Sequence, residues 1–316
     1  MATWTTSAAV GERESLADVI ARIDPADTPV FSNAKKQTTK AVFHEWQVQE
    51  LTAASDTNYV NEGSDWSYVN PSATTRLGNY HQISAQAAQV SGTLEVVDKA
   101  GRDRETAYVK ILKSLEQRRD IDKSLFKNEA RSSSDPRKCG KLLSYITNMS
   151  LISASTTPAG TGADVSDMAG TNAALTIAKV DAAMKAAYDD GGSPSMLVVN
   201  PANKVAFSDL SSGGAVTNQL HMTANAPTDA IIIGSVSMYL TDFGTLNVVI
   251  DRQATNTEVL LLDKDHYSIG HLPGRLFSVS DVAPTGDAIK FAIVSEWTLI
   301  CDAPKAHAAV VDLSTT

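Results

Sequence analysis

Cysteine is scarce in this chain of 316 residues, which has two, Cys139 and Cys301, far apart in the sequence. Two separated cysteines form neither a disulfide framework nor a metal cluster, and a reducing compartment is the simplest interpretation. The start of the chain lacks a basic region followed by an apolar run, and apolar stretches such as 231–233 are far too short to cross a bilayer. We therefore expect no secretory signal and no membrane as a partner.

Positive charge is also in short supply. The chain has 27 lysine and arginine residues against 36 aspartate and glutamate residues, which gives a formal net charge of −9 and a pI of about 5.1. A general nucleic-acid binder takes most of its affinity from cations that neutralise phosphates. The composition therefore disfavours that class, although it does not exclude a wall that merely encloses nucleic acid, where a weak or repulsive surface is suitable.

Motifs for catalysis and for cofactor or metal binding are missing too. There is no G-x-x-x-x-G-K-[ST] or G-x-S-x-G pattern, and Gly160 and Gly162 form an isolated pair. The six histidines are scattered singly, without the spacing of a helical zinc site. Asp120 and Asp122 lie two apart on an expected helix, so they face different directions and form no carboxylate pair. We predict no catalytic residue, no cofactor and no metal.

The chain begins with a segment that is typical of an arm. Residues 1–40 contain scattered glycine and proline, and 14–20 predict one short helix. The segment 24–33 is expected to run extended, because residues that precede proline are pushed out of helical geometry. Val30 and Phe31 offer apolar side chains that can dock on a body. An ordered arm and a frayed terminus both remain open.

A long polar excursion follows the arm. Alternation over 41–51 predicts a strand, and 76–97 predict a returning strand. The faces expected to be shared are Val42, His44, Trp46 and Val48 on the first strand, and Ile83, Ala85, Ala87 and Gln89 on the second. Between them, 52–75 form a polar tip that carries three aromatic residues. Long loops are uncommon unless they bind something, and such aromatics anchor interfaces; a floppy loop with incidental aromatics is the alternative.

Residues 102–130 predict one long helix, about 40 Å in length at ~1.5 Å per residue. Its thin apolar stripe consists of Tyr108, Ile111, Leu112 and Leu115, followed by Ile121 and Leu125. A narrow stripe indicates that one face packs on a sheet while the rest meets solvent or neighbours.

Residues 137–285 predict an α/β body. It contains an amphipathic helix at 176–192, a short buried strand at 195–201 and a helix that begins after Pro201. Further strands are expected at 230–240, 246–250 and 258–262. The last region, 288–313, predicts one long and one short strand around Pro304.

Six stretches stand out in order along the chain: HEWQVQEL at 44–51, NEGSD at 61–65, RLGNYHQI at 76–83, VSGTLEVVDKAG at 90–101, SLEQRRDIDKSLFKNEA at 114–130 and TGDAIKFAIVSEWTLICDAPKAHA at 285–308. As an ordered set they resemble the major capsid (major head) proteins of tailed bacteriophages with the Hong Kong 97-type fold. Gln49 stands where an acidic residue is expected, a small departure.

The resemblance implies an α+β chain in four parts. These are an N-terminal arm at 1–40, an extended β-hairpin loop at 41–90, a peripheral domain with a long spine helix at 91–136 and 286–316, and an axial α/β domain at 137–285. It further implies a major capsid protein that self-assembles into hexamers and pentamers of an icosahedral phage head. The head encloses double-stranded DNA without sequence-specific binding. Separate scaffolding, portal and decoration proteins are further partners, and the location is the virion, assembled in the bacterial host cytoplasm.

Two other functions remain open from the sequence. An encapsulin-like compartment would keep the fold and hold protein cargo, and an enzyme would carry an unrecognised site in the α/β body. For a capsid subunit, the candidate intersubunit contacts are Trp66, Tyr68 and Arg76 on the loop, and Arg118, Arg119 and Asp122 on the spine helix.

Overall fold

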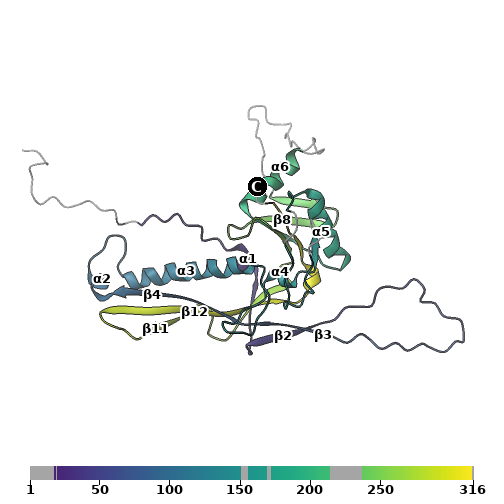
Figure 1. Cartoon of the computed structure of the whole chain (residues 1–316), viewed down its shortest axis with the longest axis horizontal. Helices are drawn as coiled ribbons and strands as arrows, with labels where there is room; N and C mark the ends of the chain where they lie inside the picture. Colours follow the sequence, from purple (N-terminus) through teal and green to yellow (C-terminus); the bar gives the residue numbers. More distant parts are fainter. Residues whose placement is uncertain (1–17, 19, 151–155, 169–171, 214–236, 315–316) are drawn as a thin grey trace, which may run out of the picture.

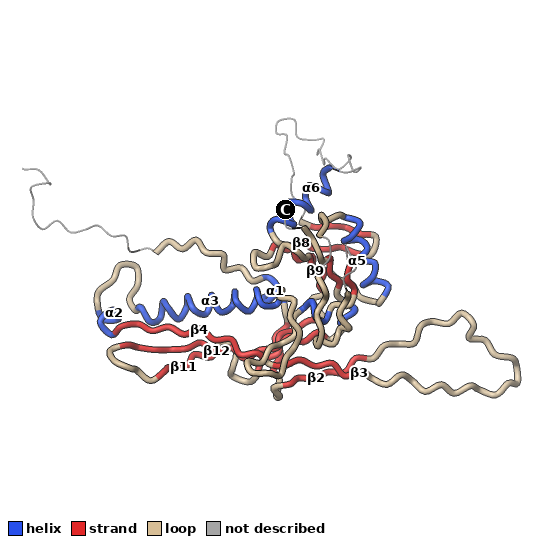
Figure 2. The backbone as a smooth tube through the Cα atoms, in the orientation of Figure 1, coloured by secondary structure: helices blue, strands red, loops and turns tan. Residues whose placement is uncertain are grey.

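The computed structural model describes residues 18, 20–150, 156–168, 172–213 and 237–314. Figure 1 shows an elongated half, in which a long helix lies along a sheet, and a compact α/β unit to one side of it. A two-stranded hairpin projects from the body at the opposite end from the long helix, as the tube in Figure 2 also shows. The chain is therefore not a single compact globule.

A five-stranded sheet forms the elongated half, with β12 (Ala288–Cys301) at its centre. On one side, β12 pairs antiparallel with β4 (Gln82–Ser91) from Ala288↔Ser91 to Trp297↔Gln82. On the other side it pairs with β11 (Ser278–Val282) and β10 (Tyr267–His271), and β1 (Lys35–Thr38) pairs parallel with β10. The long strand expected near the C-terminus is confirmed.

The spine helix predicted over 102–130 is α3 (Glu105–Leu125), which lies along β4 (Figure 1). Glu105 in its first turn and Lys123 in its last complement the helix dipole. The predicted apolar stripe is partly wrong, because Ile111 is 58% exposed. The fully buried positions lie further along and include polar groups; Gln117 Nε2 donates to Ser84 O of β4 at 2.7 Å. The contact is polar because β4 presents small and polar residues.

A six-stranded sheet forms the compact unit. Its strands, in spatial order, are β5 (Asn148–Ser150), β13 (Ala308–Val310), β9 (Val259–Leu262), β6 (Met196–Val199), β8 (Gly244–Ile250) and β7 (Met238–Thr241). Three helices accompany it, α4 (Leu142–Tyr145), α5 (Ile177–Asp189) and α6 (Pro201–Gly213). The predicted helix and buried strand are confirmed, since Val180, Met184 and Ala187 of α5 and all of β6 are buried. Residues 230–236 of one expected strand lie outside the described residues.

The two sheets do not divide the chain at residue 285. Strands β10 and β11 precede that point, yet they pair with β12 in the five-stranded sheet. Strand β13 follows it, yet it pairs with β5 and β9 in the six-stranded sheet. The two C-terminal strands, which were expected to join one sheet, therefore divide between two, because the chain crosses from one sheet to the other at Pro304.

The end of the arm docks on the body through a short helix. Segment 24–33 was expected to be extended, but α1 (Pro29–Asn33) is helical from Pro29, which suits the first turn of a helix. Val30 and Phe31 are buried, so an ordered attachment is confirmed at this point. Most of the helix expected at 14–20 lies outside the described residues.

The first predicted strand of the polar excursion is confirmed as β2 (Phe43–Val48), which pairs antiparallel with β3 (Thr75–Tyr80). The returning segment is split into β3 and β4 and ends in the short helix α2 (Gly92–Val96). On β4 the predicted common face is the exposed one, with Ile83 51% exposed.

Candidate functional site

The tip of the hairpin is the most exposed part of the described chain. Every residue from 49 to 76 is exposed, and residues 49–74 form no strand or helix. The exposed apolar side chains there are Leu51, Tyr59, Val60, Trp66, Tyr68 and Val69. Trp66 is 73% exposed and Tyr68 is 91% exposed. Such a concentration of apolar surface on a projecting loop is typical of a protein interface.

Among the described residues, few contacts compensate for holding this loop in a single shape. Ordering a backbone costs about 1–2 kcal/mol per residue. Between residues 51 and 71 the hydrogen bonds are short-range, such as Ser64 Oγ to Asn61 O at 2.8 Å and Thr57 N to Ser55 Oγ at 3.3 Å. Longer-range bonds form only near the base of the loop, where Lys305 Nζ lies 2.8 Å from Glu50 Oε2. An ordered tip therefore requires contacts from outside the chain.

The root of the hairpin, in contrast, is held firmly by Asn79 of β3. Asn79 is fully buried, and its Nδ2 donates to Leu299 O at 2.8 Å and to Gly140 O at 3.0 Å. Its Oδ1 accepts from Gly140 N at 2.8 Å and from Tyr80 N at 2.9 Å. One side chain thus ties the hairpin to β12 and to the chain before α4.

His81 makes a second tie beside Asn79. Thr39 Oγ1 lies 2.7 Å from His81 Nε2, and Val42 O lies 3.0 Å from His81 Nδ1. A carbonyl accepts, so Nδ1 carries the proton and Nε2 accepts from the Thr39 hydroxyl. Burial lowers the pKa of His81, and the ring stays neutral in this position. The hairpin therefore has a fixed root and an exposed tip.

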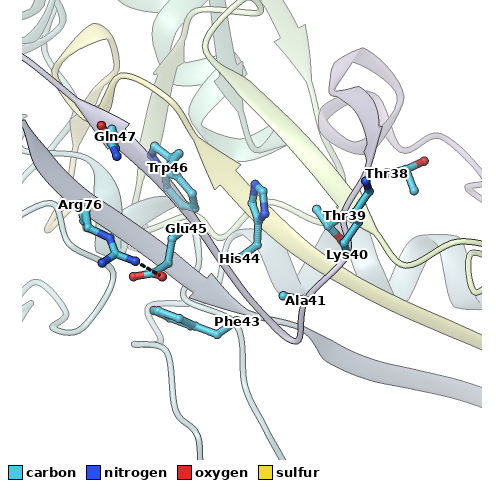
Figure 3. Close-up of a pocket in the computed structure, with 10 residues that line it drawn as sticks. All are labelled: Thr38, Thr39, Lys40, Ala41, Phe43, His44, Glu45, Trp46, Gln47 and Arg76. Atoms are coloured by element: carbon cyan, nitrogen blue, oxygen red, sulfur yellow. Dashed lines mark hydrogen bonds and ion pairs between the residues drawn. The ribbon is translucent and has the colours of Figure 1, made fainter.

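A hollow of about 580 Å³ lies at the root of the hairpin. Figure 3 shows its lining, which consists of Thr38, Thr39, Lys40, Ala41, Phe43, His44, Glu45, Trp46, Gln47 and Arg76. Glu45 Oε2 is paired with Arg76 at 2.5 Å, which leaves that carboxylate occupied. Burial lowers the pKa of His44, with Asp302 opposing the shift. The hollow is an open depression of mixed polarity that suits contact with another polypeptide.

The predicted contact residues fall into two groups. Trp66 and Tyr68 lie on the exposed tip, and Arg76 lies at the start of β3 with its side chain 65% exposed. On α3, Arg118 NH2 donates to Ser32 Oγ at 2.5 Å and Arg119 NH1 donates to Pro25 O at 3.4 Å. These two arginines hold the arm of their own chain.

For Asp122 the prediction of an intersubunit contact is wrong. Its side chain is fully buried, because it packs inside the chain between α1 and the turn after β8. As expected, Asp122 does not pair with Asp120. Its partner is Asp251, and the sequence predicted a role neither for Asp251 nor for Asn79. Spacing along the chain holds no signal for a pair so far apart in sequence.

Comparison with known protein families shows to which family the chain belongs. The family described as SU10 major capsid protein matches residues 3–314. The chain belongs to the SU10 major capsid protein family. Among curated relatives, the "Major capsid protein" of Escherichia phage Phieco32 is 30% identical over 122 residues, which are 39% of this chain and 35% of that protein. The match thus spans about a third of the relative's length.

Solved structures agree with this family. The "Cyanophage A-1(L) capsid asymmetric unit" matches with a TM-score of 0.66 at 16% identity, covering 98% of each chain. The SrpI encapsulin of Synechococcus elongatus matches with a TM-score of 0.57 at 11% identity, covering 97% of this chain and 94% of that chain. Identities this low establish the fold alone. The predicted α+β, Hong Kong 97-like fold and the resemblance to phage major capsid proteins are confirmed.

The family implies a structural role in a phage capsid. No helix of the described residues is both long and apolar enough to cross a membrane. In the same residues, no group of three or more His, Cys, Asp or Glu side chains is placed to hold a metal ion.

Proposed function

We propose that this SU10-family capsid protein self-assembles into the hexamers and pentamers of an icosahedral phage head that encloses double-stranded DNA. Its part in the virion is structural rather than enzymatic, and it assembles in the cytoplasm of the bacterial host. The single observation that carries the proposal is the fully exposed loop at 49–76, which holds Leu51, Trp66 and Tyr68 in the open on a rigid root. Such a subunit is completed by its neighbours.

The four parts of the chain serve this assembly in different ways. Residues 1–40 act as the arm, 41–90 as the extended loop, 91–136 with 286–316 as the peripheral domain, and 137–285 as the axial domain. Sheet pairing changes these bounds, since it favours placing β4, β10 and β11 with the peripheral domain and β13 with the axial domain. Scaffolding, portal and decoration proteins are separate partners.

The loop carries charge of one sign. Residues 49–74 contain four acidic residues, Glu50, Asp56, Glu62 and Asp65, and no lysine or arginine. A loop of one charge sign binds a surface of the opposite sign, so the contact joins two different faces of neighbouring copies. Contacts of this head-to-tail kind close into rings. Trp66, Tyr68 and Arg76 are the residues we assign to this contact.

The test removes the tip or its aromatics. Each aromatic side chain that becomes buried takes about 150–250 Å² out of water, about 4–6 kcal/mol at full burial. Deletion of residues 55–72, or the pair Trp66→Ala and Tyr68→Ala, should leave a soluble chain that forms no shells in negative-stain images and sedimentation. Ser64→Ala, a small polar change in the same loop, should assemble normally. Normal shells from the deletion would refute the proposed contact.

An encapsulin-like shell is the second candidate, favoured by the match to the SrpI encapsulin. The two differ in content, since a phage head protects packaged DNA from nuclease and a cargo compartment holds protein. Nuclease treatment of purified particles, followed by extraction of protected DNA, separates them. We favour the phage head because the family is that of phage capsid proteins.

A further inference from the structure

Two carboxyl groups meet inside the molecule where three parts of the chain converge. Asp122 lies near the end of α3, and Asp251 follows β8 directly. Both side chains are fully buried, and the two carboxyls are hydrogen-bonded to each other. The third part is α1, whose Phe31 N donates to Asp122 Oδ1 at 2.7 Å.

Each carboxyl has one oxygen that backbone donors satisfy and one that they do not. Asp251 Oδ1 accepts from Gln253 N at 2.7 Å, as Asp122 Oδ1 does from Phe31 N. Both Oδ2 atoms are buried, and among the described residues they find no N–H donor. A proton held between the two carboxyls is what satisfies these remaining oxygens.

The charged groups around the pair do not neutralise it. Arg118 of α3 donates to Ser32 Oγ and stacks over the Phe31 ring at 5.7 Å, and the Lys36 ammonium of β1 donates to the carbonyls of Phe31 and Ala34. No lysine or arginine of the described chain forms an ion pair with either carboxyl; the ion pairs that do form involve other acids. Two further groups face the pair, Asp27 before α1 and the buried Tyr267 of β10, and neither supplies positive charge.

Burial and the lack of an ion-pair partner raise the pKa values of both carboxyls. Burial, followed by the hydrogen bond to Asp251 and its charge, raises the pKa of Asp122 to about 8, against the opposing effects of the Phe31 N–H and Arg118. Burial also raises the pKa of Asp251. Two adjacent carboxylates with which no cation forms an ion pair cannot both ionise at low cost, so one proton stays on the pair at neutral pH.

We propose that Asp122 and Asp251 form a proton-binding site that fastens α1 to α3 and to the turn after β8, and that loss of the proton releases α1. Of the three elements, α1 yields most readily. It has five residues, and most residues from 20 to 27 before it are exposed. By contrast, α3 packs along β4, and β8 is paired on both sides, with β6 and with β7.

The direction and size of the effect are fixed by linkage. An Asp freed by opening returns to an ordinary pKa near 3.9, while the closed site keeps its proton up to about pH 8. Between these values opening releases one proton, so the opening equilibrium constant rises about tenfold per pH unit and levels off above pH 8. Burial lowers the pKa of Lys36 to about 8 as well. Lys36 stays almost fully charged up to about pH 7, so measurements from pH 6 to 7 isolate the carboxyl pair.

Hydrogen exchange of α1 in the full-length, unassembled chain tests the proposal. The reporters are the Ser32 amide, bonded to Thr28 O at 2.9 Å, and the Ala34 amide, bonded to Val30 O at 3.1 Å. After correction for the intrinsic pH dependence of exchange, wild-type protection should fall about tenfold from pH 6 to 7. Protection that stays constant over this range would overturn the proposal.

Variants show whether the proton on the carboxyl pair causes the pH dependence of α1 protection. Asp122→Asn keeps an oxygen acceptor for Phe31 and places an N–H where the protonated carboxyl has its O–H, so its protection should not change with pH. Asp120→Asn is the matched control: Asp120 is exposed on the same helix and accepts from Gln86 Nε2 at 2.6 Å. It should keep the wild-type slope.

A wild-type slope in Asp122→Asn would contradict the assignment. If that variant fails to fold, Asp251→Asn provides the same test, because either amide removes the titrating pair. The readout needs no shell, so it stays distinct from a failure of the capsid proposal.

Discussion

Replacing Asn79 by alanine should loosen the root of the hairpin and destabilise the whole chain. The Asn79 side chain makes four hydrogen bonds at 2.8 to 3.0 Å: three buried ones to Gly140 and Leu299, and a partly buried one from Tyr80 N. Alanine removes all four and leaves the backbone groups of Gly140 and Leu299 buried without these partners. Because a typical internal hydrogen bond contributes about 1 kcal/mol and an unpaired buried group costs about 1–3 kcal/mol, the loss should be on the order of 4 kcal/mol.

Urea unfolding of the unassembled chain, followed by tryptophan fluorescence, measures this loss as a shift in midpoint. Asn61→Ala makes the same chemical change at an exposed position of the tip and should shift the free energy of unfolding by less than about 0.5 kcal/mol. If Asn79→Ala costs under about 1 kcal/mol, the argument that this residue anchors the hairpin is wrong.

Two more predictions concern the compact unit. Burial lowers the pKa of His307 to about 4, so the unfolded chain binds a proton that the folded chain does not below about pH 6.5. The His307 contribution to stability should fall by roughly 3 kcal/mol from pH 6.5 to 4. The difference in urea midpoints between wild type and His307→Gln measures it, because the buried carboxyls of Asp122, Asp251 and Glu258 titrate in both chains. Gly192→Ala places a Cβ 2.6 Å from Ala306 Cα, which should cost about 1–3 kcal/mol. An unchanged melting temperature would contradict that close approach.

Local patterns in the sequence predicted much of the secondary structure. The helix α5, the buried strand β6 and the long strand β12 each carry their signal within a dozen or so residues, as helical spacing, an apolar run or alternation. The apolar stripe of α3 was partly wrong, because Ile111 stays exposed while Gln117 is buried against β4. Periodicity indicates that a helix has a buried side, but which residues are buried depends on what covers it.

For the hairpin, too, the sequence predicted the exposed part but not the contacts that hold it. The sequence predicted an excursion with Trp66 and Tyr68 on a polar tip, and both are exposed. The residues that hold its root were not predicted, because Asn79 and His81 are polar residues in a strand and nothing in their neighbours marks them as buried. Their partners, Gly140, Leu299 and Thr39, come from three separate segments.

By itself, then, the sequence determined the kinds of elements, their order and the lack of known catalytic motifs, since these are written in short patterns and in composition. Tertiary structure alone decided that β13 leaves the sheet of β12 and that Asp122 is a buried partner of Asp251 rather than a surface contact. The physical reason is that burial and proton sharing depend on the position of distant segments, which is set by the packing of the whole chain.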